Sequence, residues 1–86
     1  MAYEREINFL GILKDDYNYI ARDSNGRLYI YEFKPTLDVG RGYYVVEKGK
    51  FQCLSFINDT LFPNVLYSDG RAKSIEVLLE FYHSFI

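Results

Sequence analysis

The stretch that decides the fold runs from Tyr17 to Phe33 and reads YNYIARDSNGRLYIYEF. Its two ends, residues 17–22 and 28–33, are rich in aromatic and β-branched residues, and they flank a polar segment over 23–27. Two such runs around a short segment that contains Asn-Gly are typical of an antiparallel β-hairpin. We therefore expect the sheet of this protein to be built outward from these residues.

The turn of this hairpin admits two registers. A two-residue type I′ turn over Asn25 and Gly26 would pair Ser24 with Arg27. A type I turn followed by Gly26 as a left-handed bulge residue would pair Asp23 with Arg27 instead. We favour the second register because it sets two opposite charges across from each other.

In the favoured register the two faces of the hairpin differ in chemistry, because side chains alternate across a strand. One face carries the aliphatic residues Ile20, Leu28 and Ile30. The other face carries mostly aromatic residues: Tyr19, Ala21, Tyr29, Tyr31 and Phe33. The pattern leaves open which of the two faces is covered.

The rest of the chain predicts helices at the ends and short strands in the middle. Apolar residues at helical spacing predict one helix over residues 4–15 and another from the N-cap Ser74 to the chain end. Shorter elements are expected between them: a loop at 34–41, strands at 42–46, 51–54 and 64–68, and a short helix over 55–61. This order predicts an α+β fold, in which an antiparallel sheet of four to five short strands carries both terminal helices on one face.

Length and charge limit the classes of protein to consider. A chain of 86 residues is expected to form one small domain over residues 1–86. Ten basic against twelve acidic residues give a formal net charge of −2, which disfavours nucleic-acid binding through a large positive field. An acidic N-terminus and the lack of a long apolar segment predict a cytoplasmic protein without a membrane partner.

Residue types that carry chemistry are sparse. The single cysteine, Cys53, lies in an apolar run without a nearby base, where Cys behaves as a small hydrophobic residue. The single histidine, His83, lies near a helix C-terminus, where the helix dipole favours its charge. Asp15, Asp16 and Asp59 lack the spacing of a cation-binding loop. We therefore predict no catalytic residue, no cofactor, no metal and no enzymatic activity.

The tyrosines of the sheet are the candidates for binding a partner: Tyr19, Tyr29, Tyr31 and Tyr43. Tyrosine commonly packs under a helix with its hydroxyl in water, which is the plainest interpretation. With nearby arginines, the same residues are also typical of protein-binding surfaces. A stacking platform for single-stranded nucleic acid is the alternative, and the acidic net charge disfavours it.

The C-terminal helix carries more apolar residues than one contact with a sheet requires. Phe81 and Phe85 belong to a second apolar stripe, beside the stripe that is expected to cover the sheet. A small chain cannot wrap both stripes, and exposed apolar patches mark association. The sequence therefore predicts a homodimer with Phe81 and Phe85 near the contact.

Several motifs resemble a known group of sequences: YIARD at 19–23 with Gly26, LYIYE at 28–32, KP at 34–35, GYY at 42–44 and SIEVLL at 74–79. They are similar to short uncharacterised proteins from phages and prophages of Gram-positive bacteria. Tyr44 stands where that group has Trp. The resemblance implies a phage-encoded origin and supplies no catalytic residues.

Together these observations predict a small, non-enzymatic protein-interaction module that acts on a host or phage protein. The alternative is an accessory protein that binds single-stranded nucleic acid through its tyrosine-rich sheet face.

Overall fold

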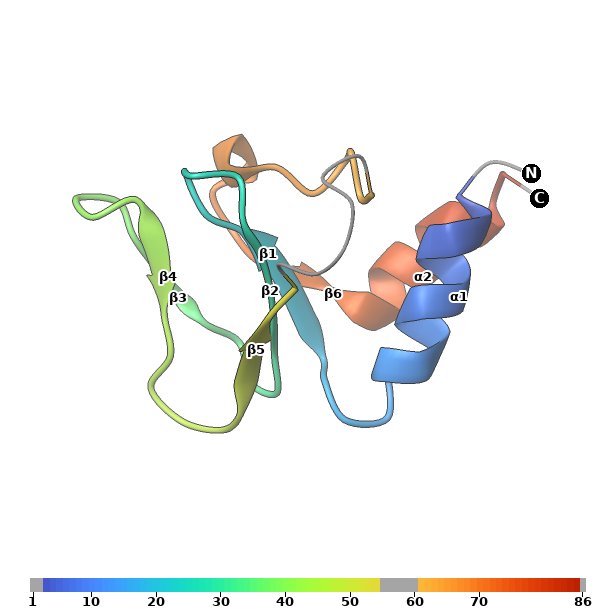
Figure 1. Cartoon of the computed structure of the whole chain (residues 1–86), viewed down its shortest axis with the longest axis horizontal. Coiled ribbons are helices and arrows are strands. Elements are labelled where there is room, and N and C mark those ends of the chain that lie inside the picture. Colours follow the sequence, from blue (N-terminus) through green and yellow to red (C-terminus); the bar gives the residue numbers. More distant parts are fainter. Residues whose placement is uncertain (1–2, 55–60, 86) are drawn as a thin grey trace.

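The computed structural model describes residues 3–54 and 61–85 (Figure 1). Within these residues two α-helices form, α1 (Glu4–Leu13) and α2 (Ile75–His83). The short strands are β1 (Tyr19–Arg22), β2 (Leu28–Tyr31), β3 (Thr36–Asp38), β4 (Tyr43–Val45), β5 (Phe51–Cys53) and β6 (Lys73–Ser74). A 3-10 helix, η1 (Tyr67–Asp69), precedes β6.

The elements form three layers. Four strands make an antiparallel sheet in the order β5-β2-β1-β6, and β3 and β4 pair separately as a two-stranded ribbon. Both helices lie on one side of the sheet and the ribbon lies on the other (Figure 1). The predicted α+β fold is therefore confirmed.

The hairpin adopts the register that the sequence favoured. Arg22 pairs with Leu28, and beyond it the Asp23 N–H donates to the Arg27 carbonyl at 2.9 Å. Gly26 has a φ of 88°, the left-handed conformation that the bulge requires. The register favoured for its opposed charges is therefore confirmed.

Each face of the sheet has its own core. The helix-side core consists of buried, mostly aliphatic residues: Leu10, Ile20, Leu28, Ile30, Leu54, Phe62, Val65, Ile75, Leu78 and Tyr82. The ribbon-side core consists of Ala21, Tyr31, Tyr44 and Ala72. The helices therefore cover the aliphatic face, a choice that the sequence had left open.

The loop expected at 34–41 contains strand β3, which is a correction. Leu37 lies opposite Tyr44, so β3 pairs with β4 through a tight connection at 39–42. Gly42 has a φ of 77° at the end of this connection. Strand β2 ends at Tyr31, and β3 begins directly after Pro35, because the chain leaves the first sheet and pairs locally.

The strand expected at 64–68 is also wrong. Val65 is 1% exposed and Leu66 is 46% exposed, an alternation typical of a strand, but the backbone forms turns and then η1. The Leu66 N–H donates to the Asp69 carboxylate at 3.0 Å, which stabilises the 3-10 turn. The strand that joins the sheet is β6, which pairs with β1.

The terminal helices are shorter than expected. The first ends at Leu13, and the second ends at His83 before the C-cap Ser84. The Ser74 side chain accepts the Val77 N–H at 3.4 Å, as its predicted role of N-cap requires. The short helix expected over 55–61 falls almost entirely outside the described residues. No described helix has the length and apolar character needed to cross a membrane.

Candidate functional site

Arg22 attaches the segment 61–65, which packs into the helix-side core, to the hairpin. Its Nε donates to the Val65 carbonyl at 2.8 Å, and its Nη1 donates to the Gly26 carbonyl at 2.8 Å. Its Nη2 donates to the carbonyls of Leu61 and Phe62 at 3.0 and 3.2 Å. Hydrogen bonds from a charged donor are stronger than neutral ones, so this arginine has a structural role.

Asp23 attaches the ribbon from the opposite face. Its Oδ1 accepts the Tyr44 N–H at 3.2 Å, and the neighbouring Ser24 N–H donates to the Gly42 carbonyl at 3.0 Å. Gly42 has a φ of 77°, which strains any other residue, and a Cβ there would also crowd the Ser24 side chain, at 2.5 Å from its Oγ and 3.3 Å from its Cβ. Burial raises the pKa of the Asp23 carboxyl, and the hydrogen bond from Tyr44 opposes that rise.

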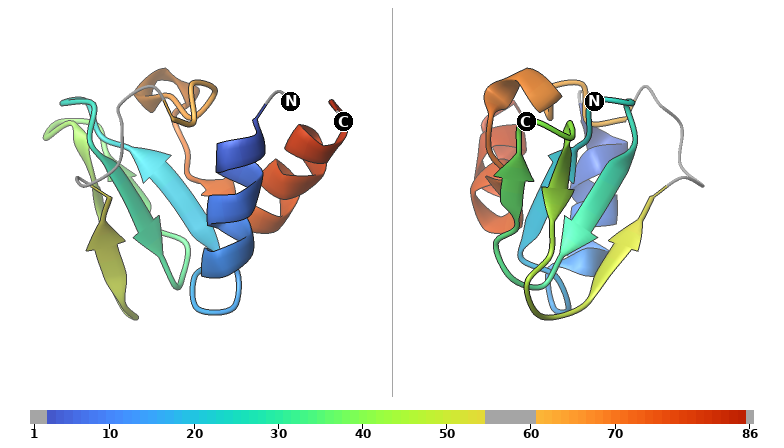
Figure 2. Two further views of the ribbon diagram at one scale, coloured as in Figure 1. Left: turned by 45° about the vertical axis from the view of Figure 1, so that its right-hand side comes forward. Right: turned by 90° about the vertical axis from the view of Figure 1, so that its left-hand side faces the viewer.

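The ribbon covers only part of the tyrosine-bearing face. The right-hand view of Figure 2 shows β3 and β4 in front of one half of the sheet, with β2 and β5 uncovered beside them. An open groove of about 640 Å³ lies there, which we call the aromatic groove. Aromatic and aliphatic residues line most of it, namely Tyr29, Tyr31, Tyr43, Tyr44, Val45, Val46 and Phe51. Asp23, Ser24, Asn25, Arg41 and Gly42 line the remainder.

The rings of this groove form a connected set around Tyr31. Its ring is stacked on those of Tyr29 and Phe51, with centroid distances of 6.4 and 6.5 Å. The Tyr44 ring is tilted against it at 6.4 Å. Burial raises the pKa of Tyr31 and of Tyr44 above the ordinary tyrosine value, and the Tyr44 hydroxyl has no hydrogen-bond partner among the described residues. These two tyrosines therefore form a hydrophobic base for the groove.

The structure brings together three of the four predicted tyrosines. Tyr29, Tyr31 and Tyr43 line the aromatic groove, whereas Tyr19 lines a different one. Tyr31 is 2% exposed and presents almost no surface to a partner, whereas Tyr43 is 39% exposed. Whether any of them binds a partner stays a prediction.

Two exposed residues of the groove were missed by the sequence analysis. Phe51 is 55% exposed and Val45 is 37% exposed. Phe51 pairs with Tyr31, and the alternation of strand side chains places both on the same face. Strand alternation would have placed Phe51 on this face once its pairing with Tyr31 was known. Nothing local in the sequence shows that the ribbon leaves the half of the sheet beside β5 uncovered.

Arg41 holds Tyr43 at the mouth of the groove. Its Nη1 donates to the Tyr43 hydroxyl at 3.0 Å, and its Nε lies 3.5 Å from the Asp38 Oδ2. The tyrosine is thereby oriented by an exposed cation that is itself partly neutralised. The mouth of the groove is amphipathic, with a phenol and a guanidinium beside apolar side chains.

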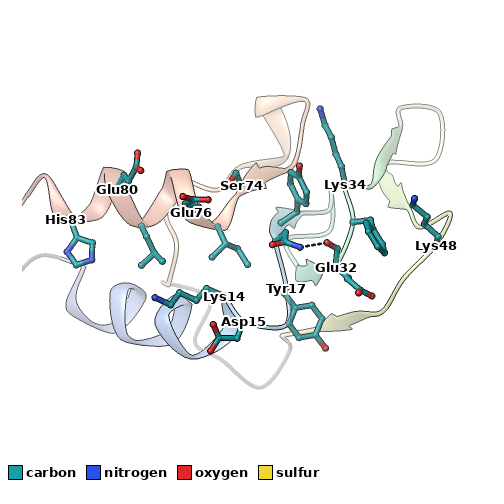
Figure 3. Close-up of a pocket in the computed structure, with 15 residues that line it drawn as sticks. Lys14, Asp15, Tyr17, Glu32, Lys34, Lys48, Ser74, Glu76, Glu80 and His83 are labelled. Carbon is teal, nitrogen blue, oxygen red and sulfur yellow. Dashed lines mark hydrogen bonds between the residues drawn. The ribbon is translucent and has the colours of Figure 1, made fainter.

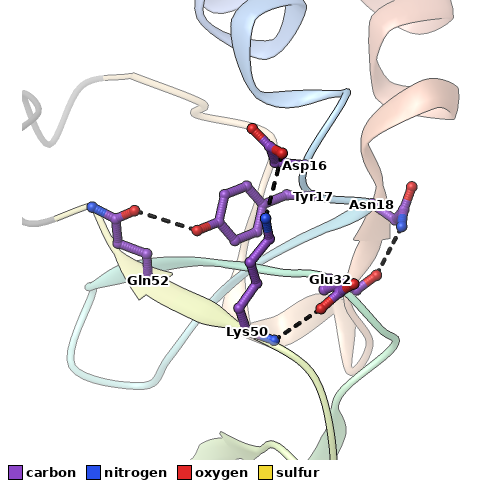
Figure 4. Close-up of polar contacts among 6 residues, drawn as sticks. All are labelled: Asp16, Tyr17, Asn18, Glu32, Lys50 and Gln52. Atoms are coloured by element: carbon purple, nitrogen blue, oxygen red, sulfur yellow. Dashed lines mark hydrogen bonds and ion pairs between the residues drawn. The ribbon is translucent and has the colours of Figure 1, made fainter.

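Polar contacts on the helix side hold β5 in place (Figure 4). The Lys50 Nζ lies 3.4 Å from the Asp16 Oδ1, and the Lys50 N–H donates to the Glu32 carboxylate at 3.1 Å. The Tyr17 hydroxyl lies 3.5 Å from the Gln52 Oε1. This side of β5 is polar, in contrast to the side that faces the aromatic groove.

A second groove, of about 870 Å³, lies between the helices and the end of the sheet (Figure 3). The ionisable residues that line it are Lys14, Asp15, Glu32, Lys34, Lys48, Glu76, Glu80 and His83. Among the described residues no ion pair joins these charges to one another. The signs are mixed along the groove, so its chemistry favours no single class of ligand.

The residues considered for catalysis lie on different layers. Cys53 is on β5 of the sheet, and His83 is in the last turn of α2. Over residues 3–54 and 61–85, no group of three or more histidine, cysteine, aspartate or glutamate side chains is arranged to hold a metal ion.

The predicted dimer residues are exposed on the outer side of α2. Val77, Phe81 and Phe85 are 62%, 43% and 53% exposed, and we call them the α2 ridge. The two phenylalanine rings meet edge to face at 5.2 Å. The opposite side of the helix is buried in the helix-side core through Ile75 and Tyr82.

No family model, curated protein or solved structure matches this chain, so the site is interpreted from its own residues.

Proposed function

We propose that this chain is a small non-enzymatic protein-interaction module and that its partner binds in the aromatic groove. One observation carries the proposal: exposed Tyr43, Val45 and Phe51 surround a base of buried tyrosines in one open groove. Tyrosine and arginine are the residue types that dominate binding energy at protein interfaces. An apolar groove rimmed by polar groups is the usual form of such a site.

A protein partner fits these residues better than single-stranded nucleic acid. Stacking of bases requires exposed ring faces, and the central ring of the set, Tyr31, is 2% exposed. The cation at the groove mouth, Arg41, lies within 3.5 Å of Asp38, which weakens its attraction for phosphate. The resemblance to phage and prophage sequences supports a phage-encoded module acting on a host or phage protein in the cytoplasm.

The proposal is tested with a random-peptide library displayed on messenger RNA and selected on the purified chain. We expect labelled selected peptides to bind the native chain and to lose binding to Val45→Asp and Phe51→Asp. The matched control is Ile12→Asp, because Ile12 is 76% exposed on α1, away from the groove. Failure to select any peptide, or binding that survives both groove substitutions, would overturn the proposal. Salt-dependent binding of oligo-dT that these substitutions abolish would support nucleic acid instead.

We further propose that the α2 ridge joins two copies of the chain. Val77 and Phe81 on α2, and Phe85 just beyond its C-cap, are apolar side chains that are costly to leave in water, and a two-fold contact buries them. Sedimentation equilibrium at tens of micromolar should give twice the chain mass of 10.2 kDa. We expect Phe81→Glu with Phe85→Glu to give the monomer and Ile12→Glu to leave the dimer intact. A monomeric native chain, or a dimer that survives the double substitution, contradicts this contact.

A further inference from the structure

We infer that the partner contributes an extended segment that adds to the sheet as a strand along the free edge of β5. Alternate side chains of this segment would enter the aromatic groove. The inference rests on the proposed function, which it deepens by naming the conformation and side-chain pattern of the ligand.

The backbone of β5 provides the first argument. The order of the sheet places β5 at one end, with β2 as its neighbour. The Leu54 N–H donates to the Leu28 carbonyl at 2.8 Å, and the Glu32 N–H donates to the Lys50 carbonyl at 2.9 Å. Because backbone groups alternate in direction along an antiparallel ladder, Phe51 and Cys53 direct theirs away from β2.

These outward groups have no hydrogen-bond partner within the part of the chain that the structure describes. Unpaired N–H and C=O groups at the spacing of a strand recognise the backbone of another extended chain. A helix docked in the groove would leave them unpaired, so the edge selects an extended ligand.

The other sheet edges are occupied, short or beside a smaller groove. The outer edge of β4 already receives the hairpin turn, because Ser24 donates to the Gly42 carbonyl and Tyr44 donates to the Asp23 carboxylate. Strand β6 has two residues and continues directly into α2. Strand β3 also has an outer edge, beside a groove of about 340 Å³. Of the described edges, β5 is therefore the one that adjoins the larger, aromatic groove.

The groove provides the second argument. Residues that pair across neighbouring strands place their side chains on the same face of the sheet. A residue opposite Phe51 or Cys53 would therefore project towards the aromatic groove, where Tyr43 and Val45 form the far wall. Apolar side chains, aromatic ones included, match this wall and the exposed Phe51 ring.

The residues between them would meet the opposite face, whose chemistry is polar. Gln52 lies there beside the Tyr17 hydroxyl, and Lys50 lies beside Asp16. The ligand is thus a strand of alternating apolar and polar residues. Its paired part spans about three to five residues, since β5 itself has three.

The inference is tested with the peptides selected above and a substitution at the free edge. The Cys53 N–H points outward, so Cys53→Pro removes an edge donor and no bond to β2. The matched control, Cys53→Val, keeps the N–H and changes only the side chain. We expect Cys53→Pro to weaken peptide binding about tenfold and Cys53→Val to leave it within about twofold. Equal affinities for these two variants would overturn the inference, while groove dependence alone would still support the proposed function.

A second measurement leaves the protein unchanged and so does not depend on folding of the proline variant. Selected peptides are resynthesised with one backbone N-methyl group at each position in turn. We expect loss of binding at every second position, where the peptide N–H faces β5, and retention at the positions between. Loss without this alternation, or helical NMR parameters for the bound peptide, would overturn strand addition.

Discussion

The two faces of the central sheet are covered by other elements to different degrees. Among the described residues, ten buried side chains form the helix-side core, whereas four form the ribbon-side core. Two helices cover the first face, and one two-stranded ribbon covers part of the second (Figure 1). The difference shows where the molecule has surface left for binding: the face that supplies less stability is the one that keeps an open groove.

The same contrast holds for the residues that attach each layer. Arg22 and Asp23 are adjacent, so they point to opposite faces of the hairpin. Arg22 donates to three carbonyls of the segment 61–65 and to the Gly26 carbonyl of its own turn, whereas the Asp23 side chain accepts one backbone N–H of the ribbon. We therefore expect the segment 61–65 to be attached to the hairpin more strongly than the ribbon.

The largest expected effect comes from removing the arginine. Arg22→Met keeps much of the apolar stem but removes the hydrogen bonds to four carbonyls, of which, within the described residues, only that of Phe62 retains another donor, the Val65 N–H. This should lower the free energy of unfolding by about 3 kcal/mol. Arg27→Met, at an exposed position of the same turn, should change it by no more than about 0.5 kcal/mol. Urea unfolding measures both. Similar losses of unfolding free energy for the two variants would contradict the structural role assigned to Arg22.

The next effect concerns the contact between the hairpin turn and the ribbon. Gly42→Ala combines a φ of 77° with a Cβ placed 2.5 Å from the Ser24 Oγ, so we expect a loss of about 2 kcal/mol. Gly26→Ala has a similar φ of 88° but no neighbour within 4 Å, and should cost about 1 kcal/mol. Thermal unfolding compares the pair. A smaller loss at Gly42 than at Gly26 would contradict the close approach.

Two buried tyrosine hydroxyls, one on each face, should respond with opposite signs. Tyr44 Oη has no hydrogen-bond partner within residues 3–54 and 61–85, so Tyr44→Phe should be neutral or stabilising by up to about 1 kcal/mol. The Tyr82 hydroxyl donates to the Asn64 side chain, so Tyr82→Phe should destabilise by about 1 kcal/mol. Urea unfolding of both variants tests this. Destabilisation by Tyr44→Phe would mean that its hydroxyl is satisfied in solution.

The smallest expected effect is a pH dependence on the ribbon side. The pKa of Asp23 is raised above its ordinary value of 3.8, so the folded state binds the proton more tightly than the unfolded state. The protonated Asp23 carboxyl therefore contributes stability below pH 3.8, and this contribution is lost as the pH rises through the raised pKa of the folded state. Asp23→Asn keeps an oxygen acceptor for the Tyr44 N–H and should remove this loss. Urea unfolding at acidic and neutral pH checks the slope, with exposed Asp15→Asn as the control. A native chain that gains stability over Asp23→Asn as pH rises would reverse the sign.

Part of the candidate site could be predicted from the sequence. Alternation along the hairpin placed Tyr29 and Tyr31 on one face, and the register proved correct because Gly26 and its polar neighbours act locally. The exposed Phe51 and Val45 were not predicted, because their exposure depends on how far the ribbon extends across the sheet. The free edge of β5 could not be predicted either, since an edge is defined by the strand that is missing beside it.

The sequence by itself determined the hairpin, its register and the two terminal helices, because each depends on residues a few positions apart whose turn chemistry and spacing suffice. Only the tertiary structure decided which face the helices cover, that residues 36–38 pair with 43–45, and what the motif residues Arg22 and Asp23 do. Arg22 bonds to Val65, 43 positions away, and Asp23 to Tyr44, 21 positions away. Such contacts depend on how separate layers pack. That packing buries apolar area and pairs polar groups across the whole chain, so a local sequence pattern does not determine it.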